Sequence, residues 1–276
     1  MKKLFLLFTL AFVAMSCEMI DEKLDDFIGR DDSSVTTIAN NQIWYTSTDG
    51  EIVEPYSGEN NNYADALTTF GVNIVSNTYV DGKGVIEFDG DVTIIGDYAF
   101  WFCTSLTSVT IGDSVTTIGE GAFYNCYSLT SVTIPNSVTE IGYYAFAECS
   151  SFISVTIPDS VTEIGNYAFA WCSSLTSVTI PDSVTTIGKW AFDDCSSLES
   201  ITIPDSVTTI GYAAFSSCSS LTSVYCKPTT PPAGGYDMFY YNASGRKIYV
   251  PMESVEAYKS AYRWSEYADD IEGYNF

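Results

Sequence analysis

The chain has 276 residues, of which 46% are hydrophobic, 15% aromatic and 17% charged, so it can bury enough apolar surface to fold and is not disordered. Thirty-five Asp and Glu against eleven Lys and Arg give a formal net charge of −24, which disfavours nucleic acid and anionic membrane surfaces as partners. Histidine is absent, which excludes nucleophiles activated by histidine and all metal sites that contain it.

The amino terminus has the features of an export signal. Lys2 and Lys3 precede an apolar run over residues 4–15, which is too short to span a bilayer but typical of a secretory signal peptide. The sequence AMSC that ends at Cys17 resembles a bacterial lipobox. Residues 1–16 are therefore expected to be a signal peptide and Cys17 a lipidated residue, with an ordinary cleaved signal as the alternative.

A tandem repeat dominates the chain from Val92 to Cys226. Starting at Leu106, five units of 23 residues follow one another, among them LTSVTIPNSVTEIGYYAFAECSS and LTSVTIPDSVTTIGKWAFDDCSS. Self-similarity at this fixed length is the signature of a solenoid, in which each coil contacts its neighbours.

Within one unit the apolar pattern changes period. Residues 177–180 (SVTI) alternate and predict a short strand, and residues 181–183 (PDS) predict a turn. Val184 and Ile187 belong to a second extended piece, and residues 191–195 place Ala, Phe and Cys at helical spacing. The expected fold class is an α/β repeat solenoid, with short strands and one short helix in each 23-residue coil. The expected inward positions of this unit are Leu175, Val178, Ile180, Val184, Ile187, Ala191, Phe192 and Cys195.

One coil cannot bury enough apolar surface to offset its ordering entropy, so the coils must stack and the ends of the stack must be covered. The expected segments are a lipid-anchored acidic tether (17–40), an N-terminal β-rich cap (41–91), the solenoid (92–226) and a C-terminal cap (227–276). The last is expected to hold a strand over residues 247–250 and a helix over residues 252–270, with a buried set of Val255, Tyr258, Ala261, Tyr262 and Trp264.

Six cysteines, from Cys103 to Cys218, recur at intervals of 23 residues. Equivalent side chains of stacked coils point in parallel and lie about 4.8 Å apart, which is too far for the Cβ atoms of a disulfide. We therefore expect buried free thiols that act as small hydrophobic side chains.

The unit SVTIPDSVTEIGxxAFxxCSSL resembles the BspA-like branch of bacterial leucine-rich repeats. The flanks NQIWYTSTDGEIVEPY and KIYVPMESVEAYKSAYRWSEYADDI resemble the same family. The resemblance implies a lipoprotein of the outer membrane or cell surface that mediates adhesion or binding to a host or bacterial macromolecule. It implies a protein or glycan ligand on host or neighbouring cells, membrane contact only through the lipid anchor, and no cofactor.

Four columns of the repeat vary while the rest stays fixed, and all lie on or beside the expected helix. The aromatic residues in them form a candidate binding ridge: Tyr98, Trp101, Tyr124, Tyr143, Tyr144, Tyr167, Trp171, Trp190 and Tyr212. Rigid amphipathic rings suit contact with a macromolecule. An alternative function is a glycan-binding module of a polysaccharide-uptake system, with Tyr144, Tyr167, Trp171 and Trp190 as stacking platforms. The remaining alternative is that the rings bind no ligand and only shield the helix and one another from water.

Two further functions are less well matched by the sequence. Carboxylates such as Glu140 and Glu163 form a shallow file without the pocket that a pair of catalytic acids needs, so no enzyme is expected. Files of Ser and Thr along the strands resemble those of ice-binding solenoids, but they equally suit any solvated strand face. No metal site is expected.

Overall fold

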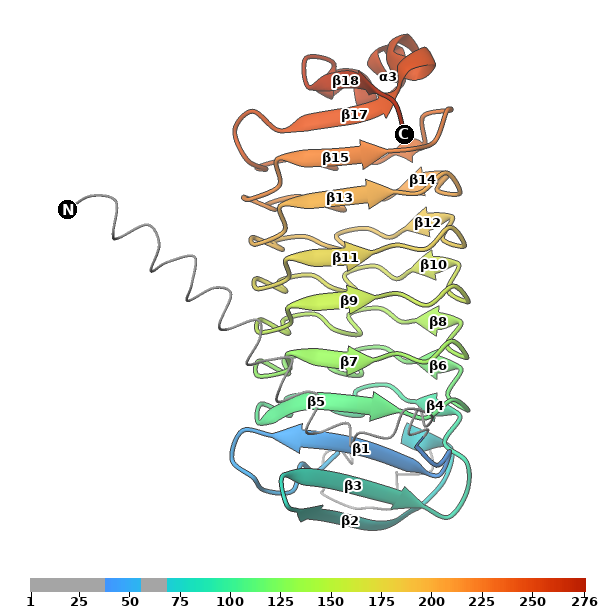
Figure 1. Cartoon of the computed structure of the whole chain (residues 1–276), viewed down its shortest axis with the longest axis vertical. Helices are drawn as coiled ribbons and strands as arrows, with labels where there is room; N and C mark the ends of the chain where they lie inside the picture. Colours follow the sequence, from blue (N-terminus) through green and yellow to red (C-terminus); the bar gives the residue numbers. More distant parts are fainter. Residues whose placement is uncertain (1–37, 56–68) are drawn as a thin grey trace, which may run out of the picture. The chain divides into compact units, whose positions relative to one another are not determined.

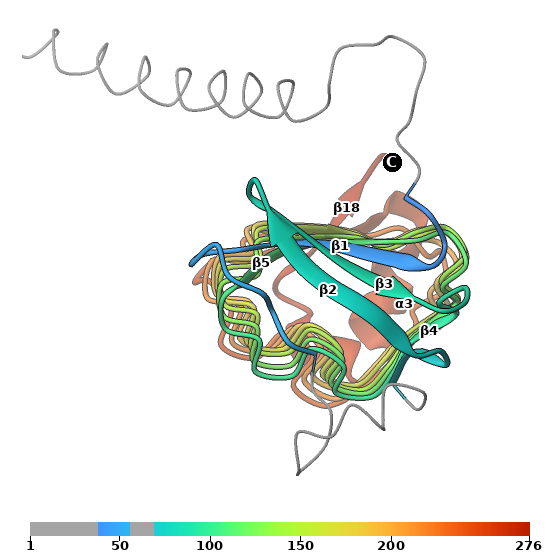
Figure 2. The ribbon, with the colours of Figure 1, turned by 90° about the horizontal axis from the view of Figure 1, so that it is seen from below.

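The computed structural model describes residues 38–55 and 69–276, and Ile38–Phe276 form one compact unit. The expected signal peptide, Cys17 and most of the tether lie outside the described residues. The stack of coils is seen from the side in Figure 1 and along its axis in Figure 2.

One face of the stack is a parallel sheet of two-residue strands, one from each coil. Neighbouring strands pair at equivalent repeat positions, as in Ile164 with Ile187 and Ile187 with Ile210. The strands are β4 (Ile94–Ile95), β6 (Thr117–Ile118), β8 (Glu140–Ile141), β10 (Glu163–Ile164), β12 (Thr186–Ile187), β14 (Thr209–Ile210) and β16 (Ala233–Gly234). This sheet corresponds to the second extended piece of each unit.

The SVTI segments form the opposite face, so the predicted strands are confirmed. They are β5 (Leu106–Ile111), β7 (Ser131–Thr133), β9 (Ser154–Thr156), β11 (Ser177–Thr179), β13 (Ser200–Ile203) and β15 (Ser223–Cys226). Alternation directs their Ser and Thr side chains to solvent and their Val and Ile side chains to the core.

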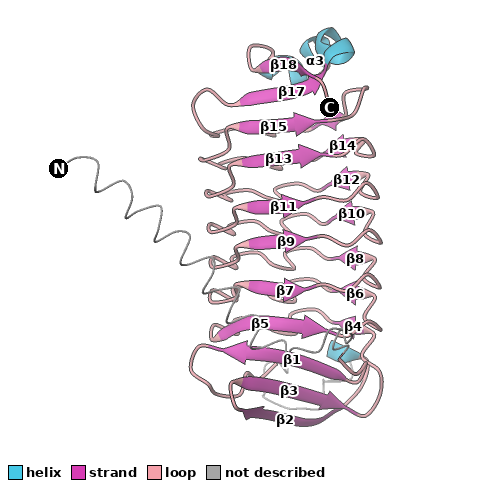
Figure 3. Ribbon diagram, viewed as in Figure 1, coloured by secondary structure: helices cyan, strands magenta, loops and turns pink. Residues whose placement is uncertain are grey.

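The prediction of a short helix in each coil is wrong. The segment with the AF motif is a pair of turns, and Figure 3 shows loop where the helix was expected. Tyr167 and Trp171 have φ angles of 57° and 59°, which is left-handed backbone that no right-handed helix contains. Successive peptide N–H groups donate alternately within the coil and to the next coil. The N–H of Ala168 donates to the carbonyl oxygen of Gly165 in the same turn, whereas that of Phe169 donates to the carbonyl oxygen of Ala191 in the next coil, at 2.8 Å. The coil exchanges helical hydrogen bonds for bonds that hold neighbouring coils together.

A ladder of phenylalanine rings, which we call the spine, runs through the core of the stack. It consists of Phe100, Phe123, Phe146, Phe169, Phe192, Phe215 and Phe239. Successive rings are nearly parallel, with centroids 5.1 to 5.7 Å apart, and all are at most 1% exposed. Of the expected inward positions around Phe192, all are buried except Val178, which is partly buried and packs against the core.

The glycine of each IG pair marks the closest approach between coils. A Cβ atom on Gly165 would lie 2.7 Å from the carbonyl oxygen of Ile141, and one on Gly188 would lie 2.7 Å from the backbone nitrogen of Asn166. Backbone cannot yield as a side chain can, so glycine is required at these positions by space rather than by φ.

The described cysteines are free and buried, as predicted. Their thiols also have a role that the sequence did not indicate, because five of them donate to the carbonyl oxygen of the spine phenylalanine 26 residues earlier. In one of these bonds Cys172 Sγ lies 3.2 Å from the oxygen of Phe146. Burial raises the pKa of Cys172 to about 12, so this thiol stays protonated at neutral pH and remains a donor.

At the N-terminal end, three antiparallel strands continue the SVTI face and close the stack. They are β1 (Gln42–Ser47), β2 (Ile74–Val80) and β3 (Lys83–Phe88), and β1 pairs with β5 of the first full coil. Figure 2 shows β2 and β3 lying across the open end of the coils, where Ile86 and Phe88 join the core.

At the C-terminal end, the predicted strand is β17 (Lys247–Pro251), and β18 (Ile271–Tyr274) pairs with it in parallel. The predicted helix is much shorter than expected and is broken into η2 (Met252–Ser254), α3 (Val255–Ser260) and η3 (Trp264–Tyr267). Arg263 has a φ of 71°, which ends any continuous helix there.

Tyr258 and Trp264 are buried as predicted and close the last coil, and Val255 and Ala261 are partly buried. Tyr262 was wrongly included in the buried set, because it is 74% exposed. In the part of the chain that the structure describes, no helix has the length and apolar character needed to cross a membrane.

Candidate binding ridge

The ridge lies on the double turns that replace the expected helices. In each coil the residue at the start of the turn pair has a positive φ, as in Tyr144, Tyr167 and Trp190, and the residue four positions later does too. Tyr144, Tyr167 and Trp190 are partly exposed, while the Ala-Phe pair that follows each of them stays in the core.

Seven of the nine predicted ridge residues form one connected group. Tyr144, Tyr167 and Trp190 stack at coil spacing, with ring centroids 4.6 and 4.7 Å apart and interplanar angles of 23° and 14°. The remaining members contact these three at centroid distances of 4.1 to 6.3 Å: Tyr124, Tyr143, Trp171 and Tyr212.

Tyr98 and Trp101 lie in the first coil of the array and contact each other at 6.4 Å. Between Tyr98 and Tyr144 the column holds Gly121, and the Tyr98 ring covers it: a Cβ on this glycine would lie 2.6 Å from the ring. The ridge therefore consists of a large stacked group and a smaller group at its N-terminal end.

The sequence-based list omitted two residues that extend the smaller group. Phe102 is 51% exposed and contacts Trp101, and Tyr127, 37% exposed, contacts Phe102. Phe102 stands in one of the four variable columns, and Tyr127 replaces a serine that later repeats carry after the cysteine. Phe102 was visible in the sequence as an aromatic residue of a variable column, and Tyr127 as a departure from the repeat.

The ridge is partly buried rather than fully exposed. Burial raises the pKa of Tyr144 and Tyr167, and the hydrogen bond that Tyr98 donates to the Glu120 carboxylate, at 2.5 Å, raises the pKa of Tyr98 to about 12. These tyrosines are neutral hydrogen-bonding groups at physiological pH.

Negative charge flanks the rings. The acidic side chains of the same columns are Asp97, Glu120, Glu148, Asp193 and Asp194, against the single cation Lys189. Burial raises the pKa of Asp193, which lies next to Trp190 in the double turn. The surface therefore favours a partner with basic or neutral groups.

The stacking limits what the ridge can do chemically. The Tyr167 ring is sandwiched between Tyr144 and Trp190, so its two faces are covered by neighbours and its edge and hydroxyl group are what a ligand meets. Ring edges and hydroxyl groups suit contact with a protein surface, whereas stacking of a sugar requires an open face.

The carboxylates that the sequence analysis weighed as catalytic acids belong to β8 and β10 rather than to the double turns. Glu140 and Glu163 are exposed on the short-strand face. Within the described ranges, no three His, Cys, Asp or Glu residues gather closely enough to hold a metal ion.

Stacked coils with strands on both faces and a shared hydrophobic spine define a leucine-rich repeat solenoid. The sequence model described as the BspA type leucine-rich repeat region matches residues 73–162 and 139–268, with six copies. These residues make up more than half of the chain, which therefore belongs to the BspA-type leucine-rich repeat family. The family's repeat is a non-catalytic scaffold.

Solved structures of leucine-rich repeat proteins are similar to this chain. The T. pallidum protein TpLRR is 33% identical, with a TM-score of 0.51 over 54% of this chain and 70% of its own. A leucine-rich repeat protein from Bacteroides ovatus is 25% identical, with a TM-score of 0.39 over 72% and 70% of the two chains. A leucine-rich cell surface protein from Faecalibacterium prausnitzii is also 25% identical, with a TM-score of 0.42 over 81% and 72%. No curated protein matches the sequence.

Proposed function

We propose that this protein is a cell-surface scaffold that binds a host or bacterial protein through the ridge. The observation that carries the proposal is the contrast between columns: the spine keeps phenylalanine in every coil, while the ridge changes residue from coil to coil and stays partly exposed. Solenoids commonly use such surfaces for recognition, because the scaffold tolerates change where packing does not dictate the residue.

A protein partner suits the ridge better than a sugar does. Stacking covers both ring faces of Tyr167 and one face of Tyr144, and the flanking carboxylates offer acceptors to Lys and Arg side chains. We infer a partner with a basic contact surface, whose association weakens as salt is added.

The test uses the full chain and a panel of purified extracellular-matrix proteins in a surface plasmon resonance assay. The double variant Tyr144→Ala/Tyr167→Ala should weaken binding at least about tenfold, since rings near the centre of an interface each contribute about 1 to 2 kcal/mol. Tyr274→Ala is the matched control, because Tyr274 is 42% exposed and lies on β18, in the sheet of the SVTI face rather than on the double turns. Equal binding by the double variant and the control would contradict the proposal.

The same proposal includes a lipid anchor at Cys17. It is supported by the apolar run over residues 4–15 and by the AMSC sequence. The anchor predicts that Cys17→Ala releases the protein from the membrane fraction and abolishes labelling by a fatty-acid probe. Protease shaving of intact cells tests whether the solenoid faces outward; resistance until the cells are lysed would place it inside.

A further inference from the structure

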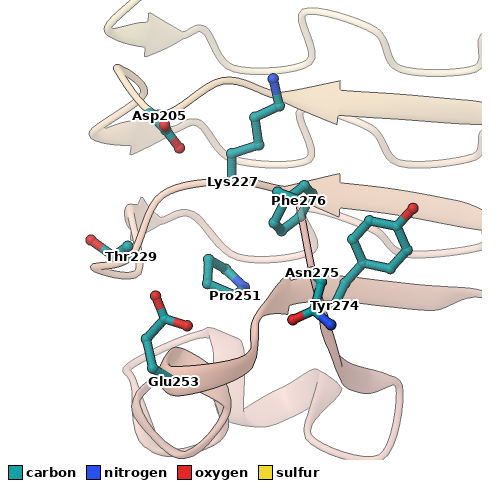
Figure 4. A pocket seen from close by; sticks show the side chains of 8 residues that line it. All are labelled: Asp205, Lys227, Thr229, Pro251, Glu253, Tyr274, Asn275 and Phe276. Atoms are coloured by element: carbon teal, nitrogen blue, oxygen red, sulfur yellow. The ribbon is translucent and has the colours of Figure 1, made fainter.

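The repeat register breaks after β15, and two neighbouring hollows lie where it breaks. One has a volume of about 330 Å³ and the other about 290 Å³, and Asp205 and Thr229 line both of them. Together they form a groove beside the loop over residues 227–232, which replaces the turn of a regular coil. Figure 4 shows the larger hollow, with side chains around it from β17, η2 and β18, from the segments that follow β13 and β15, and from the last two residues.

Three buried side chains fix the loop that forms one side of the groove. Tyr258 donates a hydrogen bond to the carbonyl oxygen of Pro228 at 2.7 Å, and Ser254 donates to that of Thr229 at 2.8 Å. Trp264 Nε1 donates to the carbonyl oxygen of Pro232 at 2.8 Å. With its backbone held by these bonds, the groove is pre-organised, and a ligand would lose little affinity to ordering the loop.

Aromatic rings form one wall of the larger hollow. Tyr274 is 42% exposed and Phe276 is 52% exposed, with ring centroids 5.1 Å apart. Tyr225 and Tyr249 support Tyr274, each with its ring centroid 5.5 Å from that of Tyr274, at interplanar angles of 70° and 56°. Tyr274 differs from Tyr167 of the ridge, which lies between two nearly parallel rings. All the rings that contact Tyr274 are tilted or T-shaped relative to it.

Polar side chains complete the lining. Asp205 and Glu253 bring carboxylates, and Lys227 and Asn275 bring donors. Among the described residues, none of the ion pairs involves Asp205, Glu253 or Lys227, so their charged ends remain available to a ligand.

This lining narrows the chemistry of the ligand. Two carboxylates against one lysine repel phosphate and other anions. The described residues contain no metal-binding cluster at this place. Aromatic rings beside hydrogen-bonding side chains suit a molecule with an apolar C–H face and a rim of hydroxyl groups, which is the chemistry of a neutral sugar ring.

We propose that the groove binds a short neutral oligosaccharide, with a sugar ring against Tyr274 and its hydroxyl groups bonded to Asp205, Glu253 and Lys227. The larger hollow lies at the small end of the usual range for ligand sites, about 300 to 1,000 Å³, and the second hollow extends it. This site is separate from the ridge and does not depend on the function proposed there.

The experiment is isothermal titration of the full chain with cellotetraose, xylotetraose, laminaritetraose, mannotetraose and maltotetraose. At least one should bind with a Kd below about 1 mM, and more tightly than its monosaccharide because the groove has two hollows. Tyr274→Ala and Asp205→Asn should each weaken that binding about tenfold.

The repeat supplies a matched control, because Asp182 is the equivalent turn residue one coil earlier and lies outside both hollows. Asp182→Asn and the ridge variant Tyr167→Ala should leave the affinity unchanged. The proposal is overturned if none of the five sugars binds, if Tyr274→Ala binds as the unaltered protein does, or if Tyr167→Ala abolishes binding. The last result would place the sugar on the ridge.

Discussion

The spine and the ridge are two aromatic ladders built on the same 23-residue repeat. In the spine every coil supplies phenylalanine, the rings are parallel, and nothing but core surrounds them. In the ridge, the column that starts at Tyr98 holds Tyr, Gly, Tyr, Tyr, Trp and Ala. Its stack ends at Trp190, whose contact with the next coil is the T-shaped one to Tyr212 in the neighbouring column. The difference shows that stacking at the coil spacing does not by itself require identical rings. The same ring is required in every coil where the column is fully buried from water.

The ridge also tolerates backbone that the spine does not need. Five of its nine residues, Tyr98, Tyr144, Tyr167, Trp171 and Trp190, occupy left-handed φ at a cost of about 1 to 2 kcal/mol each, and the stack offsets this because alternate N–H groups bond to the next coil. Glycine would avoid this strain at the first left-handed position of each double turn, yet among the coils from Tyr98 to Ala213 only the one with Gly121 has glycine there.

The largest effect is expected in the spine. Phe192→Ala removes a fully buried ring from between two others and leaves a cavity, which should lower the free energy of unfolding by about 3 to 5 kcal/mol. Urea denaturation followed by circular dichroism measures this loss. A loss below about 1 kcal/mol would show that neighbouring coils collapse to fill the gap.

A smaller loss is expected where coils approach most closely. Gly165→Ala places a Cβ against backbone atoms of the preceding coil and should cost about 3 kcal/mol in the same denaturation experiment. Glu163→Ala, an exposed position on the adjacent strand, is the control and should cost little. Equal stabilities for the two variants would mean that the coils can separate without penalty.

The ridge predicts a change of opposite sign. Ala213 has a φ of 51°, so Ala213→Gly should relieve strain and stabilise the protein by up to about 1 kcal/mol. Ala168 is also buried but does not have a positive φ, so Ala168→Gly should destabilise it by about 1 kcal/mol. Thermal unfolding of the pair checks the contrast, and a loss of stability in both would contradict the left-handed assignment.

The smallest effect concerns pH. Burial raises the pKa of Asp193, so the folded chain keeps this proton to a higher pH than the unfolded chain does. The stabilising effect of this proton is complete at pH values below the ordinary pKa of 3.8, and it is lost as the pH rises through the raised pKa of the folded chain. Asp193→Asn should therefore gain stability relative to the unaltered protein between acid and pH 7, whereas the exposed Asp182→Asn should not. A pH-independent difference for Asp193→Asn would rule out this linkage.

The sequence predicted the repeat, the strands, the spine and the free thiols because each depends on packing between equivalent residues. It did not predict the double turns, because the apolar pattern of Ala191, Phe192 and Cys195 is compatible with a helix and equally with two successive turns. The clue was weak: Gly121 and Asn125 are residues that favour left-handed backbone, but tyrosine and tryptophan hide the preference in most coils. The ridge residues were identified from variation, while their stacking required knowledge of the turn geometry.

The groove at the C-terminal end could not be predicted for a different reason. It depends on how the loop over residues 227–232 folds against α3 and η3, through hydrogen bonds from Tyr258 and Trp264 that join segments about 30 residues apart. No repeat constrains that contact, and the expected continuous helix over residues 252–270 would have placed these side chains elsewhere.

The division between spine and ridge is tested most directly within one coil, by urea unfolding of Phe169→Ala and Tyr167→Ala. Phe169 is fully buried, whereas Tyr167 lies two positions earlier on the partly exposed ridge. We predict a loss of about 3 to 5 kcal/mol for Phe169→Ala and of about 1 kcal/mol or less for Tyr167→Ala. Losses of equal size would show that the ridge supports the fold and would contradict its assignment as a surface that is free to bind.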